Sequence, residues 1–400
     1  MTETFREHGR IVQLSVTRSA ASAAVATRSG LAVRSHGSLE ARGGPAGGTD
    51  WPGRPTLPDP DRIRHELSRA PDSDAVTGWS FQVVERRRRI AIEGAPADTA
   101  SPSTESGSME QTVDETRHLL ITLHGRDRSS GLQQRCRRAV IGDLEEWRFE
   151  WVGQLWETLV GALRRRAGAG RWRGPSDRTE LSAVFAPGVG GTVVHEAVGH
   201  LFEADVTSGP RGMPGARIAS DRLTVVDDAT LPDLWGTRRI DDEGRTCRPL
   251  TLIHAGRFGE LLHSRDTDPA RSTSARRGSY TCAPLPRMSN TYLAAGSDRT
   301  EDLMDGPLVL HCLDGGAAEV RPGSGDVLVR IRFAQLLRGG IPVADHRDLL
   351  LQVAAADLMD RIEGVGPAVH FEAARCRKEG QSVPVAHGAP AFRLPVTVLR

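Results

Sequence analysis

The sequence lacks the features of two broad protein classes. Its five cysteines are scattered, and none belongs to a Cys-x-x-Cys pair, so no disulfide framework is expected and a reducing cytoplasm is the expected compartment. The first residues show no basic and then apolar signal pattern. No apolar run approaches the roughly 20 residues that span a bilayer. We therefore expect a cytoplasmic protein with no membrane partner.

The sequence also has no excess of charge of either sign. Lysine and arginine together number 52 and aspartate and glutamate number 51, which leaves a formal net charge of +1. General nucleic-acid binders usually carry a basic excess on one face, so no nucleic-acid partner is expected. Arginine far outnumbers lysine, and the length of 400 residues favours two domains.

Residues 1–178 are predicted to form an α/β domain. Residues 81–92 and 118–124 predict strands that pair with each other, and residues 152–163 repeat apolar side chains at helical spacing. The aromatic residues between 147 and 151 alternate with polar ones, which predicts one more half-buried strand. We therefore expect helices and strands to be mixed along this part of the chain.

Residues 179–400 have a different texture. Short apolar stretches alternate with turn signals, which predicts a mainly antiparallel β domain with one late helix over residues 348–362. Upstream of this domain, residues 42–60 are rich in Gly and Pro, and residues 95–112 are rich in Ser, Pro, Thr and Glu. Both compositions predict flexible segments. The expected fold class is α+β.

The junction of the two domains carries the motif with the clearest chemistry. A helix predicted over residues 192–205 contains His-Glu-Ala-Val-Gly-His at positions 195–200. In the familiar metallopeptidase motif the two histidines are four residues apart on one helix face, with the glutamate as base. A spacing of five residues places the second histidine roughly 140° from the first. The helix must therefore be kinked, widened or ended near His200, and Gly199 permits such a distortion.

Two histidines do not complete a metal site. A catalytic zinc usually keeps three protein ligands and one open position. Glu203, Asp205, another histidine or a cysteine are all candidates for the third ligand, and spacing alone does not choose among them. The alternative is a capped helix that carries two incidental surface histidines.

Several ordered blocks of the sequence resemble one family, the TldD subunit of the TldD/TldE (PmbA) metallopeptidases. The resemblance runs over roughly residues 80–400 and is dense from residue 181 onward. Its blocks are residues 191–205 around the histidines, 223–228 followed by 240–244, 276–280 followed by 286–292, and 375–385 around a cysteine. Because the blocks occur in the family's order, chance similarity is a poor explanation.

This resemblance implies a specific site. One zinc ion per chain would be held by His195, His200 and Cys376, with Glu196 as the catalytic acid and base. The implied reaction is hydrolysis of extended or unfolded peptides. The implied assembly is a dimer, either with a TldE-like partner subunit that lacks the metal motif or with a second copy of the chain. The implied fold is an α/β domain followed by a mainly β domain, with the metal-binding helix at their junction.

Four other residues near these blocks have predicted roles. Arg276 and Arg277 are expected to bind a peptide carboxylate, and a structural ion-pair role is the alternative. Glu203 and Asp205 are expected to support the ligands or the end of the helix.

Three functions are weighed. The leading one is a zinc peptidase, including one that trims a leader or precursor peptide in natural-product biosynthesis. A metal-dependent tailoring enzyme for a peptide-derived metabolite would use the same ligands. A non-catalytic partner subunit is the third, and the presence of Glu196 argues against it, because such a subunit has no reason to keep an acid/base group.

Overall fold

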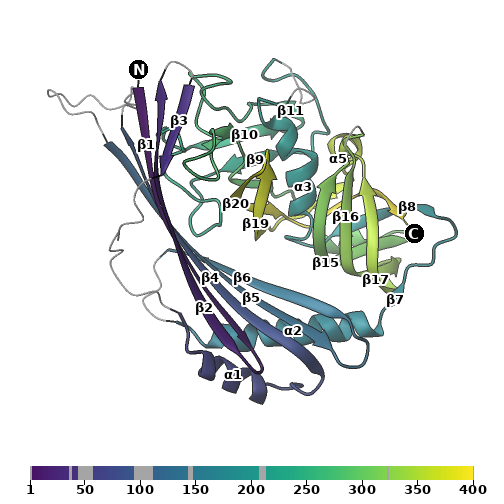
Figure 1. The fold of residues 1–400 in the computed structure, drawn as a ribbon. Helices are drawn as coiled ribbons and strands as arrows, with labels where there is room; N and C mark the ends of the chain where they lie inside the picture. The colour runs from purple at the N-terminus through teal and green to yellow at the C-terminus, as the bar shows by residue number, and fades with distance from the viewer. Residues whose placement is uncertain are drawn as a thin grey trace. The chain divides into compact units, whose positions relative to one another are not determined.

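The computed structural model describes residues 2–35, 38–43, 57–93, 111–142, 147–206, 213–321 and 324–399. The two segments predicted to be flexible, 42–60 and 95–112, lie largely outside these residues. Strands predominate over helices in the described part of the chain (Figure 1). None of the described helices is long and apolar enough to cross a membrane.

The chain divides into two compact units that interleave along the sequence. Unit 1 comprises Met1–Ala167, Arg238–Thr246 and Arg277–Pro284, and unit 2 comprises Gly168–Thr237, Cys247–Arg276 and Leu285–Arg400. The predicted boundary at residue 178 follows chain order. Two short stretches from the second half of the sequence nevertheless belong to unit 1.

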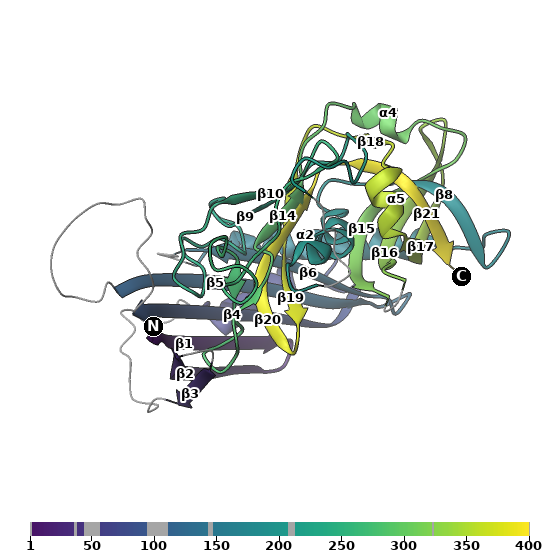
Figure 2. The same cartoon turned by 90° about the horizontal axis from the view of Figure 1, so that it is seen from above.

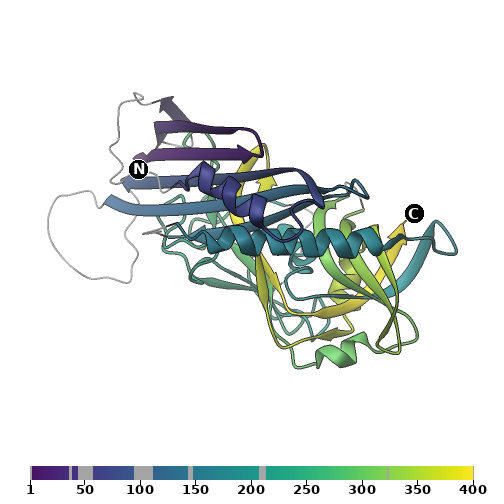
Figure 3. The same cartoon turned by 90° about the horizontal axis from the view of Figure 1, so that it is seen from below.

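Unit 1 contains a six-stranded sheet in the order β3-β2-β1-β4-β5-β6 (Figure 2). Its strands are β1 (Thr2–Thr17), β2 (Ala21–Ser35), β3 (Ser38–Gly43), β4 (Val76–Glu93), β5 (Gln111–Asp127) and β6 (Gln133–Ile141). Helices α1 (Pro60–Arg69) and α2 (Glu150–Gly168) lie along one face of this sheet (Figure 3). The predicted pairing of the strands around residues 81–92 and 118–124 is confirmed, because β4 and β5 are neighbours.

Two predictions for this unit are wrong. All strand pairs described in unit 1 are antiparallel, so the sheet is not the core of an α/β domain with helices between parallel strands. The alternating aromatics near residue 150 do not form a strand. Helix α2 begins at Glu150, and Trp147 packs edge-on against Trp151 with ring centroids 5.6 Å apart. Aromatic packing at a helix start therefore produced the period-two pattern.

Unit 2 is mainly β, as predicted, with two principal sheets. One has the order β18-β21-β8-β15-β16-β17-β7 and the other β11-β10-β9-β14-β20-β19, and β12 pairs with β13. The strands are β7 (Gly170–Arg171), β8 (Arg178–Phe185), β9 (Val225–Asp228), β10 (Pro249–His254), β11 (Arg257–Phe258), β12 (Ala275–Arg276), β13 (Leu285–Pro286), β14 (Asn290–Leu293), β15 (Val309–Val320), β16 (Val327–Arg338), β17 (Ile341–Val353), β18 (Gly364–Val365), β19 (His370–Lys378), β20 (Gln381–Ala389) and β21 (Phe392–Leu399). Its α-helices are α3 (Gly191–Ala197), α4 (Thr300–Met304) and α5 (Ala355–Asp360).

The late helix predicted over residues 348–362 is only partly present, because the first part of this range is strand. β17 continues to Val353, and only the short α5 follows. Leu349, Leu351 and Val353 are buried while the residues between them are half-buried, which is the alternation of a strand. A dense run of leucines fits both a helix and a strand, and pairing with β16 decides in favour of the strand.

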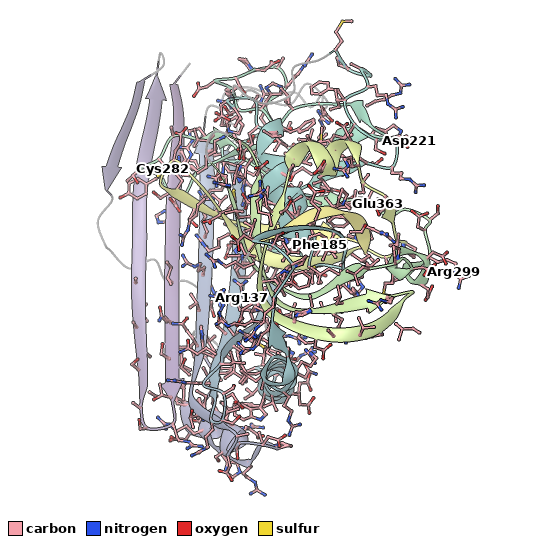
Figure 4. All side chains as sticks on the ribbon, turned by 90° about the vertical axis from the view of Figure 1, so that its right-hand side faces the viewer. Arg137, Phe185, Asp221, Cys282, Arg299 and Glu363 are labelled. Atoms are coloured by element: carbon pink, nitrogen blue, oxygen red, sulfur yellow. The ribbon has the colours of Figure 1, made fainter. Side chains whose placement is uncertain are left out.

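The core of unit 2 positions helix α3. Phe185 at the end of β8 stacks on Phe392 of β21 with ring centroids 5.2 Å apart, and Figure 4 labels Phe185 among the packed side chains. A Cβ at Gly190 would lie 2.0 Å from the Phe392 ring, so the turn before α3 requires glycine. Val193, Val194 and the rest of the apolar face of α3 are fully buried in the same core. Burial of this face fixes the direction in which the helix presents its polar residues.

Candidate metal centre

The histidine helix is interrupted between its two histidines, as the five-residue spacing predicts. α3 ends at Ala197, and a 3₁₀ helix, η1 (Gly199–Phe202), follows. Val198 joins them with φ −118° and ψ −55°, and its N–H still bonds to the carbonyl of Val194 at 3.0 Å. The tighter winding of η1 changes the direction of the second histidine.

Gly199 is required here by a close approach. A Cβ on this residue would lie 2.0 Å from the sulfur of Met288, whose side chain is fully buried. Gly199 does not have a positive φ, unlike Gly188 before the helix. The sequence therefore predicted the place of the distortion, and the structure supplies a different reason for the glycine.

The structure brings together the three predicted ligands. One ligand atom from each of His195, His200 and Cys376 lies within 4.8 Å of the other two. The sulfur of Cys376, on β19, is 3.5 Å from Nε2 of His200. The two imidazole rings are 5.1 Å apart and almost perpendicular, at 80°. His195 and Cys376 are buried, so the cluster is largely withdrawn from solvent.

The electrostatics of the cluster favour a thiolate. Burial raises the pKa of the Cys376 thiol, but hydrogen bonds and positive charge from His195 and His200 outweigh burial and hold its pKa well below the ordinary value. Burial lowers the pKa of His200, but Cys376 and Glu203 outweigh it and raise the pKa to about 11. A thiolate is the form of cysteine that binds metals.

A charged group of side chains supports His200 from the other side. Oε2 of Glu203 accepts a hydrogen bond from Nδ1 of His200 at 2.9 Å and another from Lys378 at 3.0 Å. Lys378 also donates to Asp205 at 2.5 Å. Nε of Arg287 lies 4.0 Å from the other carboxylate oxygen of Glu203, Oε1. Burial raises the pKa of Glu203, but His200 and Lys378 outweigh it and lower the pKa.

Glu196 lies beside the cluster without belonging to its core. Its carboxylate is 3.8 Å from Nε2 of His200, and its side chain is 22% exposed, so solvent reaches it. Burial raises the pKa of Glu196 and outweighs the opposing effect of His195 and His200. A carboxylate beside a candidate metal site, with its pKa raised toward neutral pH, is suited to proton transfer.

The residues present fit a zinc ion. Nδ1 of His195 is buried and has no hydrogen-bond partner among the described residues, and such an atom is costly unless something binds that ring. Two imidazoles and one thiolate are a donor set that zinc accepts, with one position left open. A cluster of three such donors was found at this place among the described residues.

The two arginines predicted to bind substrate make internal contacts. Arg276 donates to the carbonyls of Met288 at 2.6 Å and Pro384 at 2.7 Å, and it is buried. Arg277 belongs to unit 1, where its guanidinium donates to the Asp242 carbonyl at 3.1 Å and lies over the Phe5 ring. These contacts are those of the structural alternative, and substrate binding by either arginine stays a prediction.

Sequence reasoning gave no role to Arg287 and did not predict the contacts of Lys378. Arg287 is fully buried and donates to the carbonyl of Cys376 at 2.9 Å, which fixes the backbone that carries the thiol. No local pattern around Arg287 indicates this role. Lys378 stands out in the sequence, because it is the only lysine in the chain and lies two residues after Cys376.

A family model matches the second half of the chain, and curated relatives match about half of it. The family described as PmbA/TldA metallopeptidase C-terminal domain matches residues 178–398. A metalloprotease TldD homolog of Buchnera aphidicola is 30% identical over 234 residues, which cover 55% of this chain and 48% of that protein. A zinc metalloprotease TldD homolog of Saccharolobus solfataricus is 27% identical over 231 residues, covering 54% and 50%. The chain thus spans about half the length of these relatives.

A solved structure matches the whole fold. TldE from Thermococcus kodakarensis superposes with a TM-score of 0.61, and the match covers 98% of this chain and 96% of that one at 15% sequence identity. This likeness concerns the fold alone. The family match over residues 178–398, which carry the histidine helix and the cysteine strand, is specific in sequence. The chain belongs to the PmbA/TldD family of metallopeptidases.

Proposed function

We propose that this chain is a zinc-dependent peptidase that hydrolyses extended or unfolded peptides. The observation that carries the proposal is the convergence of ligand atoms from His195, His200 and Cys376 within 4.8 Å, with Glu196 beside them. The name of the Saccharolobus relative, a zinc metalloprotease, supports the choice of metal. Membership of the family supports the choice of reaction.

The chain's own residues divide the chemistry between them. Zinc, when bound, supplies a Lewis acid that polarises the scissile carbonyl and makes water more acidic. Glu196 takes the proton of the attacking water and passes it to the leaving amine, which requires a carboxylate that can be both base and acid. The raised pKa of Glu196 supports this double role. Its partial exposure leaves room for water and a peptide.

The thiolate of Cys376 affects how much of the catalysis depends on the metal and how much on Glu196. A thiolate ligand adds one negative charge, so the ion is a weaker Lewis acid than one held by three neutral histidines. More of the catalysis must then come from proton transfer. Glu196 therefore carries a larger share of the rate than the equivalent base of a three-histidine site.

The finer proposals concern substrate and assembly. We propose that the natural substrate is a leader or precursor peptide and that the active form is a dimer with a TldE-like subunit or with a second copy. The resemblance of the sequence blocks to TldD subunits supports the dimer.

The test compares metal content and cleavage of a peptide library for the wild type, Glu196→Gln and Cys376→Ser, each with and without a candidate partner subunit. The wild type should hold one zinc per chain. Glu196→Gln should keep the zinc and lose about 10²- to 10⁴-fold in cleavage rate. Cys376→Ser should lose both zinc and activity.

Matched controls exist in unit 2 for both variants. Glu260→Gln removes a half-exposed carboxylate that pairs with Arg248, and Cys312→Ser changes a buried cysteine whose pKa is raised by burial. Both controls should keep zinc and activity. A wild type without stoichiometric zinc, or Glu196→Gln with normal cleavage, would contradict the proposal. A zinc-free chain that activates a partner would instead identify a non-catalytic subunit.

A further inference from the structure

The only lysine of the chain lies at the candidate metal centre. Every other member of the 52 basic residues is an arginine, yet position 378 carries Lys. Lys378 is two residues beyond Cys376 on β19, so the two side chains leave the strand on the same face. Only 12% of the Lys378 side chain is exposed.

The ammonium of Lys378 has three acceptors around it. Nζ lies 3.0 Å from Oε2 of Glu203, 2.5 Å from Oδ1 of Asp205 and 3.3 Å from the carbonyl oxygen of Pro286. An ammonium has three N–H donors, so all of its hydrogen-bonding capacity is used. A guanidinium is planar, larger and forked, and it cannot direct three donors from one point. The site therefore selects lysine in a chain that otherwise uses arginine.

Glu203 depends on this ammonium. Its side chain is fully buried, and an isolated carboxylate in such a place is strongly disfavoured unless it is paired. The same oxygen that accepts from Lys378 also accepts from Nδ1 of His200 at 2.9 Å. Lys378 and His200 thus meet at one atom of Glu203. Removing the lysine charge changes how strongly that atom holds the imidazole.

The hydrogen bond to Glu203 fixes the orientation of His200. With Nδ1 donating to the carboxylate, the other nitrogen, Nε2, faces the sulfur of Cys376 at 3.5 Å. A carboxylate behind a histidine ligand sets its ring orientation and raises its basicity. His195 differs, because its Nδ1 has no hydrogen-bond partner among the described residues.

We propose that Lys378 is a positioning residue of the metal centre: it holds Glu203 as an ionised acceptor, and Glu203 in turn holds His200 with Nε2 directed at the metal. The inference rests on the proposed function. It makes Lys378 act on the metal through two intervening contacts, without touching the substrate. A purely structural role, in which Lys378 only ties residues 203–205 to β19, is the competing explanation.

The first test measures metal binding in Lys378→Met, Lys378→Arg and Glu203→Gln. Zinc affinity is measured by competition with a chromophoric chelator, and the geometry at the metal is followed by the absorption spectrum of the cobalt-substituted protein. We expect Lys378→Met and Glu203→Gln to bind zinc about 10- to 100-fold more weakly, with altered cobalt spectra. Lys378→Arg keeps the charge but not the fit, and its affinity should lie between those of Lys378→Met and the wild type.

Arg248→Met is the matched control, because Arg248 is a partly exposed arginine of the same unit whose ion pair is with Glu260. It should bind zinc as the wild type does. Thermal unfolding in excess chelator separates folding from metal binding. If Lys378→Met and Glu203→Gln unfold normally and bind zinc with wild-type affinity and spectrum, the positioning role is wrong while the zinc site stands. If the wild type binds no zinc, both proposals fail.

The second test needs no mutation of Lys378. Because the chain has one lysine, protein grown with ¹³C-labelled lysine gives a single side-chain Cε signal in NMR spectra. Zinc should shift this signal in the wild type, and the shift should be smaller in Glu203→Gln. A lysine signal that does not move when zinc binds would overturn the inference, even if Lys378→Met fails to fold.

Discussion

Two buried groups of charged side chains, one in each unit, differ in the kinds of polar group that they bring together. In unit 1, Arg88 donates to Oε1 of Glu7 and to Oδ1 of Asp242, both at 3.0 Å. The remaining oxygens of these carboxylates accept the backbone N–H groups of Tyr280 at 2.6 Å and Arg277 at 2.7 Å. Every carboxylate oxygen of this ion network therefore has a partner.

The cluster of unit 2 is different. In its supporting half, Oε2 of Glu203 accepts from both Lys378 and His200. Its inner half leaves Nδ1 of His195 without a partner among the described residues and directs a thiolate and two imidazoles at one point. The comparison teaches that burial and charge alone do not identify a site. The groups differ in their chemistry: unit 1 pairs carboxylates with an arginine and backbone N–H groups, whereas unit 2 gathers two imidazoles and a thiol that could all bind one metal ion.

The largest effect should come from opening the ion network of unit 1. Arg88→Met leaves the buried carboxylates of Glu7 and Asp242 without their cation, and breaking a buried pair in this way costs about 3 kcal/mol. Urea unfolding should show this loss, whereas zinc affinity should not change. Arg164→Met, at an exposed arginine, is the control and should have little effect. Equal stability of Arg88→Met and the control would mean that this network is not structural.

A smaller effect should come from reshaping the centre of unit 2. Gly199→Ala places a Cβ against the sulfur of Met288, and overpacking of this kind costs about 2 kcal/mol. Because η1 carries His200, zinc affinity should fall together with stability. Gly153→Ala is the matched control, since a Cβ there in α2 meets nothing within 4 Å and should stabilise slightly. Wild-type zinc affinity in Gly199→Ala would show that His200 tolerates movement of η1.

The smallest effect concerns pH and sits beside the ion network. Burial and the neighbouring Glu243 raise the pKa of Asp241 to about 7. The folded chain therefore keeps a proton on Asp241 between about pH 4 and pH 7, where the unfolded chain has lost it. Stability should fall over that window as pH rises, by about tenfold in the unfolding equilibrium constant per pH unit, and level off above pH 7.

Asp241→Asn removes this titration while keeping an oxygen for the backbone N–H groups of Glu243 and Arg245. The difference in unfolding free energy between variant and wild type, measured in urea from pH 5 to pH 8, should therefore change with pH below 7 and be constant above it. A difference that is constant over the whole range would assign the slope to other groups.

The sequence predicted the local half of the metal centre but not the distant half. The five-residue spacing of the histidines required a break in the helix, and α3 ends at Ala197. Cys376 is 176 residues from His200, and its place depends on the pairing of β19 with β20. Periodicity carries no information about such distances, so only family resemblance pointed to the cysteine. Lys378 is brought to the cluster by the same pairing, and its contact with Glu203 does not follow from the sequence.

For the fold too, local elements could be predicted from the sequence but long-range pairing could not. The elements β4, β5 and α2 follow from apolar spacing within each segment. Whether neighbouring strands run parallel depends on connections and partners far along the chain, and the α/β expectation for the first part was wrong for that reason. The end of β17 shows the same limit, because pairing with β16 overrides a run of leucines that also suits a helix.

The interleaving of the two units has a consequence for how the protein is made. A ribosome releases Glu7 and Arg88 early, but Asp242 and the N–H of Tyr280 are translated much later. Until synthesis reaches Pro284, the last residue of unit 1, the early pair of Glu7 and Arg88 lacks its later partners, Asp242 and the N–H of Tyr280. The sequence of unit 1 is thus completed only after a large part of unit 2 has been translated. Until then, unit 1 of the nascent chain cannot form all of its native contacts.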